Sequence, residues 1–229
     1  MTKLLIINSS GRINRSITRQ LTAEFRRQWQ AAAPATEVIE RDLIAEPPAF
    51  VNEPWVAAAF ADPEQHTPQM QQAIAPSDQL VDELMSADHV VIGAPLYNFG
   101  MPAVLKAYFD QVVRVGRTFA FDASQPNPYT PLLPQTPVTV ITSAGDGALL
   151  PGGELYSLNT LEPAIKTIAG FIGLAEPEFI RVGYEEYQDN RHLDSKARAF
   201  EDLTQRIEGL TEATVYAEGA KGRAPVAMA

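Results

Sequence analysis

The sequence predicts an α/β fold: one doubly wound, five-stranded parallel sheet of strand order 2-1-3-4-5, with helices on both faces. Short apolar runs, typical of strands buried on both faces, alternate along the chain with longer segments whose apolar residues recur every three or four positions, as in amphipathic helices. The chain has 229 residues, of which 45% are hydrophobic. It is therefore long enough to form one such domain around an ample core.

The expected strands and helices alternate along the chain. Strands are expected at residues 4–7, 37–43, 90–94, 138–142 and 178–182. Helices are expected at residues 17–29, 69–85, 102–113, 161–172 and 195–210. Pro102 suits the first turn of its helix, where a missing N–H group costs nothing. This alternation of strands with crossover helices is the pattern of a parallel sheet.

Three other segments are expected to lack regular structure. Residues 47–68 and 121–137 are long, proline-containing connections of the kind that form lids or line ligand and partner sites. Residues 211–229 have few large apolar side chains. We expect them to form a mobile tail after a single domain that spans residues 1–210.

Composition excludes several kinds of site. The formal net charge of −10 and the isoelectric point near 4.8 argue against a general surface for nucleic acid or for anionic membranes. The absence of cysteine excludes disulfides, thiolate catalysis and cysteine-ligated zinc or iron–sulfur centres. His66, His89 and His192 form no local ligand pair, so no metal site is expected. With no signal-peptide layout and no apolar run of membrane-spanning length, we expect a cytoplasmic protein.

The loop after the first expected strand has the features of an anion site. Ser10, Ser16 and Thr18 carry hydroxyl groups near the start of a helix, where free backbone N–H groups favour a negative charge. Arg12 or Arg15 is available for charge-assisted hydrogen bonds. The alternative is that Ser16 merely caps the helix. The loop has neither the P-loop pattern nor the dinucleotide glycine fingerprint, which favours a monophosphate over a nucleoside triphosphate or a resident NAD.

Two further loops follow expected strands and meet the first at the carboxyl edge of the sheet. Tyr97 and Phe99 flank the Asn98 amide, a combination that suits a flat heteroaromatic ligand; the alternative is that these rings pack in the core. The loop at residues 143–147 has two glycines, so a planar ring can approach its backbone closely, although taken alone it is only a turn signal. Together the three loops predict a phosphate, an aromatic ring and a ring edge in one crevice, which describes FMN. The Glu185-Glu186 pair lies in another loop and is expected on the solvated surface.

Four segments of the chain are similar to the family of FMN-dependent NADH azoreductases, which belong with the flavodoxin-like quinone reductases. They are Ser9-Ser10, Ser16-Ile17-Thr18-Arg19, Ala94-Pro95-Leu96-Tyr97-Asn98-Phe99 and Leu105-Lys106-Ala107-Tyr108-Phe109-Asp110. The resemblance runs from about Lys3 to Leu210 and implies a flavodoxin-like fold. It also implies a homodimer with a flavin site near each subunit boundary, and substrate pockets that draw on both chains.

The resemblance assigns each loop a part of the cofactor. Ser10, Ser16, Ile17 and Thr18 would hold the FMN phosphate. Leu96, Tyr97, Asn98 and Phe99 would contact the isoalloxazine ring, and Ser143, Ala144, Gly145 and Asp146 would border its edge. Family members often show Ser-Arg-Gly-Gly at this last position, so the chain loses a cation there and gains the carboxylate of Asp146. A carboxylate near the ring edge disfavours the anionic reduced flavin, which predicts a lower flavin potential than in relatives with the arginine.

The sequence therefore predicts an oxidoreductase that works through bound FMN. NADH or NADPH reduces the flavin and leaves, and a quinone or an aromatic azo compound then takes the two electrons. The flavin supplies this chemistry, so no catalytic acid, base or nucleophile is expected from the protein. Because both substrates use one ring face, we expect ping-pong kinetics. The alternatives are a flavodoxin-like electron carrier, whose acidic surface docks on basic partners, and a regulatory protein that keeps the fold without FMN.

Overall fold

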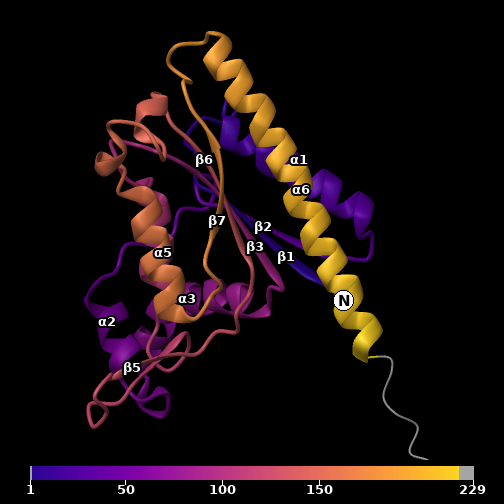
Figure 1. Ribbon diagram of the computed structural model, residues 1–229. Helices are drawn as coiled ribbons and strands as arrows, with labels where there is room; N and C mark the ends of the chain where they lie inside the picture. Colours follow the sequence, from indigo (N-terminus) through magenta and orange to yellow (C-terminus); the bar gives the residue numbers. More distant parts are fainter. Residues whose placement is uncertain (1, 222–229) are drawn as a thin grey trace, which may run out of the picture.

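A parallel sheet lies between two layers of helices (Figure 1). The computed structural model describes residues 2–221. The strands of the sheet are β1 (Lys3–Asn8), β2 (Glu37–Asp42), β3 (His89–Pro95), β6 (Val138–Ser143) and β7 (Glu178–Val182). Their pairings are all parallel and their order is β2-β1-β3-β6-β7. The predicted flavodoxin-like sheet, with order 2-1-3-4-5 over the main strands, is confirmed.

Alternating side chains of the strands divide the core into two parts. The covering helices are α1 (Ile17–Ala32), α3 (Pro68–Ser86), α4 (Ala103–Val112), α5 (Leu161–Ile172) and α6 (Asn190–Lys221). Leu4 and Ile6 of β1 pack with α1 and α6, whereas Leu5 and Ile7 pack with α3, α4 and α5. Successive side chains of a strand point to opposite faces, so one apolar run serves both layers. Figure 1 shows α1 and α6 on one side of the sheet and α3 and α5 on the other.

The prediction that residues 47–68 lack regular structure is wrong. The segment contains α2 (Glu53–Phe60) and a short 3-10 helix (Pro63–Gln65). Asn52 caps α2 by accepting a hydrogen bond from the Trp55 backbone N–H at 3.1 Å. The Trp55 indole donates to the Gln111 Oε1 atom at 2.7 Å, which fixes α2 against α4. An asparagine just before a Glu-Pro pair is the sequence signal that marked this helix start.

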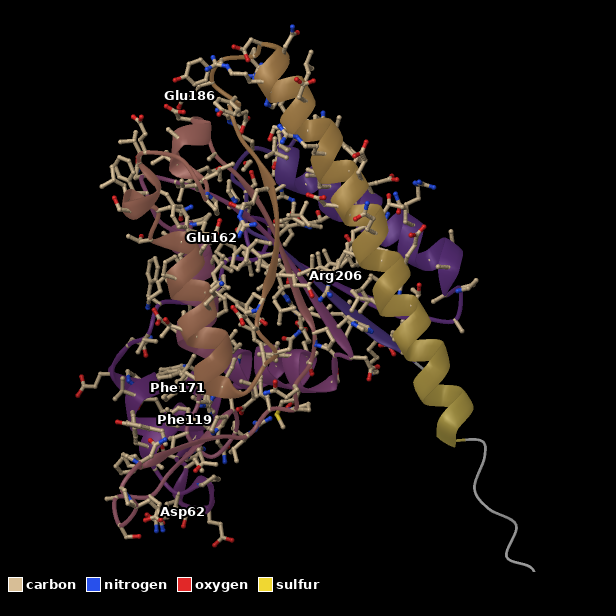
Figure 2. The ribbon with its side chains drawn as sticks, in the orientation of Figure 1. Asp62, Phe119, Glu162, Phe171, Glu186 and Arg206 are labelled. Atoms are coloured by element: carbon tan, nitrogen blue, oxygen red, sulfur yellow. The ribbon has the colours of Figure 1, made fainter. Side chains whose placement is uncertain are left out.

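Residues 121–137 also contain regular structure. A small antiparallel hairpin pairs β4 (Phe119–Phe121) with β5 (Tyr129–Pro131). The rings of Phe119 and Tyr129 pack on Phe171 of α5, with centroid distances of 4.9 and 5.5 Å. Figure 2 labels Phe119 and Phe171 at the end of the molecule opposite Glu186. The hairpin therefore lies away from the carboxyl edge of the sheet.

The last helix is longer than the sequence predicts. Its expected end is residue 210, but α6 continues to Lys221. Residues 211–221 contain no proline and several alanine, glutamate and lysine residues, which have high helix propensity. The segment expected to form a mobile tail thus begins inside this helix. Residues 222–229 lie outside the described residues.

The carboxyl ends of β1, β3, β6 and β7 meet at one edge of the sheet. β1 lies between β2 and β3, so the order of the strands reverses beside it and a crevice opens at its carboxyl end. Within residues 2–221, no helix is long and apolar enough to cross a membrane, and no group of three His, Asp or Glu side chains is placed to hold a metal ion. The loops at this edge are therefore the place to look for a ligand site.

Candidate functional site

A cavity of about 420 Å³ opens at the carboxyl ends of β1, β3 and β6. Of the predicted site residues, it is lined by Ser10, Ser16, Ile17, Leu96, Tyr97, Asn98, Ser143 and Gly145. Its lining also includes Arg12, Pro95, Glu185 and Glu186. The other predicted residues, Thr18, Phe99, Ala144 and Asp146, are not among those that line it. The three predicted loops thus come together around one cavity, whose volume lies in the range of roughly 300–1,000 Å³ that is typical of cofactor sites.

The amino terminus of α1 forms one end of the cavity. The Ser16 Oγ atom accepts a hydrogen bond from the Arg19 N–H at 3.2 Å and lies 3.1 Å from the Thr18 Oγ1 atom. Ser16 therefore caps the helix and also lines the cavity, so the two interpretations of this residue hold together. The N–H groups of Ile17 and Thr18 have no acceptor within the helix, because the first turn of any helix leaves such groups free. They form, with the Ser10 hydroxyl, a set of donors suited to a phosphate.

Arg19 holds the first loop in place. Its guanidinium donates to the Ser10 carbonyl oxygen at 2.9 and 3.1 Å, and makes a bidentate pair with Asp42 at 2.7 and 2.8 Å. The same guanidinium lowers the pKa of the Asp42 carboxyl below its usual value. Arg19 is thus engaged on both sides and positions the loop instead of meeting a ligand.

Thr18 acts through packing and through its backbone. Its side chain is fully buried, next to Gly93 of β3. A Cβ atom at Gly93 would lie 3.0 Å from the Asn8 Oδ1 atom, 3.0 Å from the Thr22 Cγ2 atom and 3.6 Å from the Thr18 Cβ atom. Gly93 therefore allows the start of α1 to lie close against β3, which sets the position of the free N–H groups.

A two-residue turn forms the second wall. The backbones of Tyr97 and Gly100 exchange two hydrogen bonds, at 2.9 and 3.0 Å, around Asn98 and Phe99. Asn98 has φ of 46° and Phe99 has φ of 70°, as in a type I′ turn. Asparagine tolerates this region, but for a bulky residue such as Phe99 the conformation is strained, at a cost on the order of 1–3 kcal/mol.

Contacts from both sides hold the strained turn. Thr160 donates to the Phe99 carbonyl oxygen twice, from its N–H and its Oγ1 atom, each at 2.8 Å. On the other side, the Tyr97 hydroxyl accepts a hydrogen bond from the Gly11 N–H at 3.2 Å. The phenol ring of Tyr97 therefore joins the first loop to the second. The Phe99 ring, 51% exposed, stands outside the cavity lining.

The third loop follows β6, and its residues Ala144 and Asp146 make hydrogen bonds with neighbouring segments. Ala144 is buried, and its N–H donates to the Val182 carbonyl oxygen at 2.8 Å. The Asp146 carboxylate accepts hydrogen bonds from the Ala148 N–H at 2.9 Å and from the Tyr187 hydroxyl at 3.1 Å. Asp146 thus caps a short 3-10 helix, Gly147–Leu149, and is absent from the cavity lining. The Asp146 carboxylate is therefore held by neighbouring groups, next to Gly145 of the cavity lining.

Two carboxylates that were expected on the solvated surface also line the cavity: Glu186 is exposed and Glu185 is half-buried. Glu185 and Glu186 lie in the loop between β7 and α6. Their N–H groups donate to the carbonyl oxygens of Ala144 and Gly145, at 3.3 and 3.1 Å. The Glu185 carboxylate pairs with Arg12 at 2.6 Å. The sequence indicates only indirectly that Glu185 and Glu186 reach the cavity. Because β7 neighbours β6 in the sheet, the loops that follow these strands meet at the same edge.

Comparison with known proteins places the chain in a family. The sequence model for the flavodoxin-like fold, Flavodoxin_2, matches residues 2–207. A protein of Opitutus terrae named FMN-dependent NADH:quinone oxidoreductase is 48% identical over 210 residues, which cover 90% of this chain and 99% of that protein. The chain belongs to the family of FMN-dependent NADH:quinone oxidoreductases. Another member, the FMN-dependent NADH:quinone oxidoreductase 2 of Trichormus variabilis, is 39% identical over 207 residues, with 90% of this chain and 99% of that protein covered.

Solved structures agree with this fold. An azoreductase from Bacillus anthracis superposes with a TM-score of 0.81 at 22% identity, over 90% of this chain and 99% of that one. An FMN-dependent NADH-azoreductase from the same species, solved in complex with FMN, gives a TM-score of 0.80 at 18% identity, over 92% and 100% of the two chains. At these identities the superpositions establish that this family member shares their fold.

The residues present fit FMN. The free N–H groups of Ile17 and Thr18 and the hydroxyls of Ser10 and Ser16 match a phosphate. The Tyr97–Asn98 turn offers an aromatic ring, an amide and backbone groups to a planar heterocycle. Ser143 and Gly145 close the cavity opposite this turn, where a ring edge needs hydrogen-bonding backbone without bulky side chains.

Proposed function

We propose that this chain is an FMN-dependent NADH:quinone oxidoreductase that also reduces aromatic azo compounds. The observation that carries the proposal is the single cavity that joins a free helix amino terminus, an aromatic turn and a glycine loop at the carboxyl edge of the sheet. The names of the family members support the same cofactor and donor. The titles of the azoreductase structures support the azo substrates.

Each wall of the cavity has a separate part in holding the cofactor. Ser10, Ser16 and the N–H groups of Ile17 and Thr18 hold the phosphate. Leu96, Tyr97, Asn98 and Phe99 form the turn on which the isoalloxazine lies, and Ser143 and Gly145 border its edge. Ala144 and Asp146 shape that border through their own hydrogen bonds instead of touching the cofactor.

When bound, FMN would supply the transfer of two electrons from NADH to a quinone or an azo compound. The protein needs no acid, base or nucleophile for this chemistry. Its residues hold the ring at a fixed place, keep one face open to both substrates in turn, and orient backbone donors toward the changing charge. One face used in succession predicts ping-pong kinetics, so initial-rate lines that intersect would contradict the mechanism.

We further propose that the protein is a cytoplasmic homodimer with its flavin sites near the subunit boundary. Large apolar side chains are exposed in the loops that form the cavity walls, including Ile13 (58%), Phe99 (51%) and Tyr97 (39%). Exposed apolar surface of this kind marks interfaces. The absence of cysteine fits a reducing compartment. Sedimentation at micromolar concentration that finds only monomer would contradict the dimer.

An anaerobic titration tests the proposed function. The FMN-loaded protein is titrated with NADH while the visible flavin band is followed, and benzoquinone is then added. Rapid bleaching followed by recovery on addition of quinone supports the reductase. FMN binding without bleaching by NADH or NADPH favours the electron carrier, and failure to bind FMN contradicts the site itself.

A further inference from the structure

We propose that Glu186 lowers the reduction potential of the bound FMN by holding a negative charge beside the edge of its ring. This inference rests on the proposed function, because it concerns the same cavity with FMN in it. It replaces the role that the sequence suggested for Asp146. Figure 2 labels Glu186 in the loop between β7 and α6, at the carboxyl edge of the sheet.

The position of Glu186 is fixed against the loop that borders the ring edge. Its N–H donates to the Gly145 carbonyl oxygen at 3.1 Å. Its side chain lies over Gly145: a Cβ atom built at Gly145 would stand 2.5 Å from the Glu186 Oε1 atom and 2.6 Å from its Cδ atom. Both residues line the cavity. The Glu186 carboxylate therefore lies on the surface that meets the cofactor.

The neighbouring carboxylates are neutralised or directed elsewhere. Glu185 pairs with Arg12 at 2.6 Å. Asp146 accepts its two hydrogen bonds outside the cavity lining. The two nearest arginines along the chain are also engaged: Arg191 pairs with Asp189 and stacks on Tyr187, and Arg181 pairs with Glu162. Among the described residues, no cation forms an ion pair with Glu186, and Arg12, a cation that lines the same cavity, is paired with Glu185.

Reduction adds charge at the place where this carboxylate acts. NADH delivers a hydride, which is two electrons with one proton, so NAD⁺ leaves and the reduced cofactor carries one more negative charge unless it takes a second proton from water. A carboxylate nearby disfavours that added charge. The protein therefore binds oxidised FMN more tightly relative to reduced FMN, and the two-electron potential falls. A lower potential gives more driving force toward poor electron acceptors such as azo compounds.

The size of the effect is limited by water. Glu186 is exposed in this structure, and exposed charges are screened by solvent. We expect the ratio of the dissociation constants for reduced and oxidised FMN to be raised by about two- to fivefold by this charge. For a two-electron couple, a tenfold change in that ratio corresponds to about 30 mV.

The test compares the full-length wild-type chain with Glu186→Gln and with Glu208→Gln. Glu208 is an exposed residue farther along α6, so its substitution makes the same change in net charge away from the cavity. Dissociation constants are measured for oxidised FMN in air and for reduced FMN under anaerobic conditions, and midpoint potentials are measured against a reference dye. We expect Glu186→Gln to lower the ratio of the reduced to the oxidised dissociation constant by about two- to fivefold and to raise the potential. Glu208→Gln should leave both quantities unchanged.

The outcomes separate this inference from the proposed function. FMN binding and NADH oxidation with an unchanged ratio in Glu186→Gln would overturn the inference alone. An equal shift in Glu208→Gln would also overturn it, because the effect would then come from net charge. If the wild-type chain binds no FMN, the proposed function fails and the inference fails with it.

Discussion

The two halves of the cavity wall are built in different ways. The loops after β1 and β3 leave polar groups open: the free N–H groups of Ile17 and Thr18, and the Asn98 amide in a turn held by Thr160. The loops after β6 and β7 hydrogen-bond to each other instead. The Glu186 N–H donates to the Gly145 carbonyl oxygen, and the Tyr187 hydroxyl donates to the Asp146 carboxylate. The difference agrees with the proposal that the first half binds the cofactor, whereas the second half closes the site and sets its charge.

The largest effect is predicted for a substitution at Gly93 of β3, in the half of the cavity wall formed by the loops after β1 and β3. Gly93→Val would place branched carbons against Asn8, Thr18 and Thr22, which displaces the start of α1. We expect a loss of about 1–3 kcal/mol in the free energy of unfolding and loss of FMN binding. Urea unfolding and FMN fluorescence quenching measure the two effects.

Gly170→Ala is the matched control for this substitution. Gly170 lies in α5, and a Cβ atom added there would have no other atom within 4 Å outside its own helix backbone and chain neighbours. We expect the substitution to raise the free energy of unfolding by about 0.5–1 kcal/mol, because a helix interior is more stable with alanine than with glycine. FMN binding should be unchanged. Equal behaviour of the two variants would contradict the close packing assigned to Gly93.

A second prediction concerns the strain stored at Phe99. Phe99→Gly and Phe99→Ala both remove the ring, but only glycine relieves the positive φ. The glycine variant should be more stable than the alanine variant by about 1 kcal/mol in urea unfolding. Weaker FMN binding by both variants than by the wild-type chain would show that the Phe99 ring, although outside the cavity lining, contacts the isoalloxazine as the sequence predicts. Equal stability of the two variants would show that the turn is not strained.

The smallest effect is predicted for Glu185, and it tests whether Glu185 and Glu186 act on different parts of the cofactor. Glu185→Gln releases Arg12, which becomes available to the phosphate. We expect the affinities for oxidised and reduced FMN to rise by the same factor, about two- to fivefold, as for an exposed ion pair. The dissociation constants of both forms measure this effect. A change in their ratio would mean that Glu185, like Glu186, acts on the ring.

Much of the binding half follows from the sequence. A helix amino terminus, a turn of Asn98 between aromatic residues, and a small-residue loop are local features, and the alternation of strands and helices brings them to one edge. The apolar runs predict the parallel sheet, whereas its strand order follows from taking the sheet as doubly wound. Local patterns therefore predict the fold, and the cavity contains most of the predicted residues.

The half of the cavity wall formed by the loops after β6 and β7 depends on contacts between distant segments, which no local sequence pattern predicts. Glu186 lies over Gly145 because the two loops meet across β6 and β7, far apart in the sequence. Asp146 lies in a loop of the expected kind, but a nearby N–H and the Tyr187 hydroxyl take up its carboxylate. The helix at residues 53–60 was detectable from its Asn52 cap, whereas the β4–β5 pairing needed the packing of Phe119 on Phe171.

The assignment on which the rest depends is that the start of α1 holds the phosphate of FMN. It can be tested by comparing the dissociation constants of FMN and riboflavin for the wild-type chain, measured by flavin fluorescence quenching. Riboflavin lacks only the phosphate, and one hydrogen bond to a charged group contributes about 1.5–3 kcal/mol. We expect riboflavin to bind at least about tenfold more weakly than FMN. Equal affinity for the two flavins would contradict the assignment.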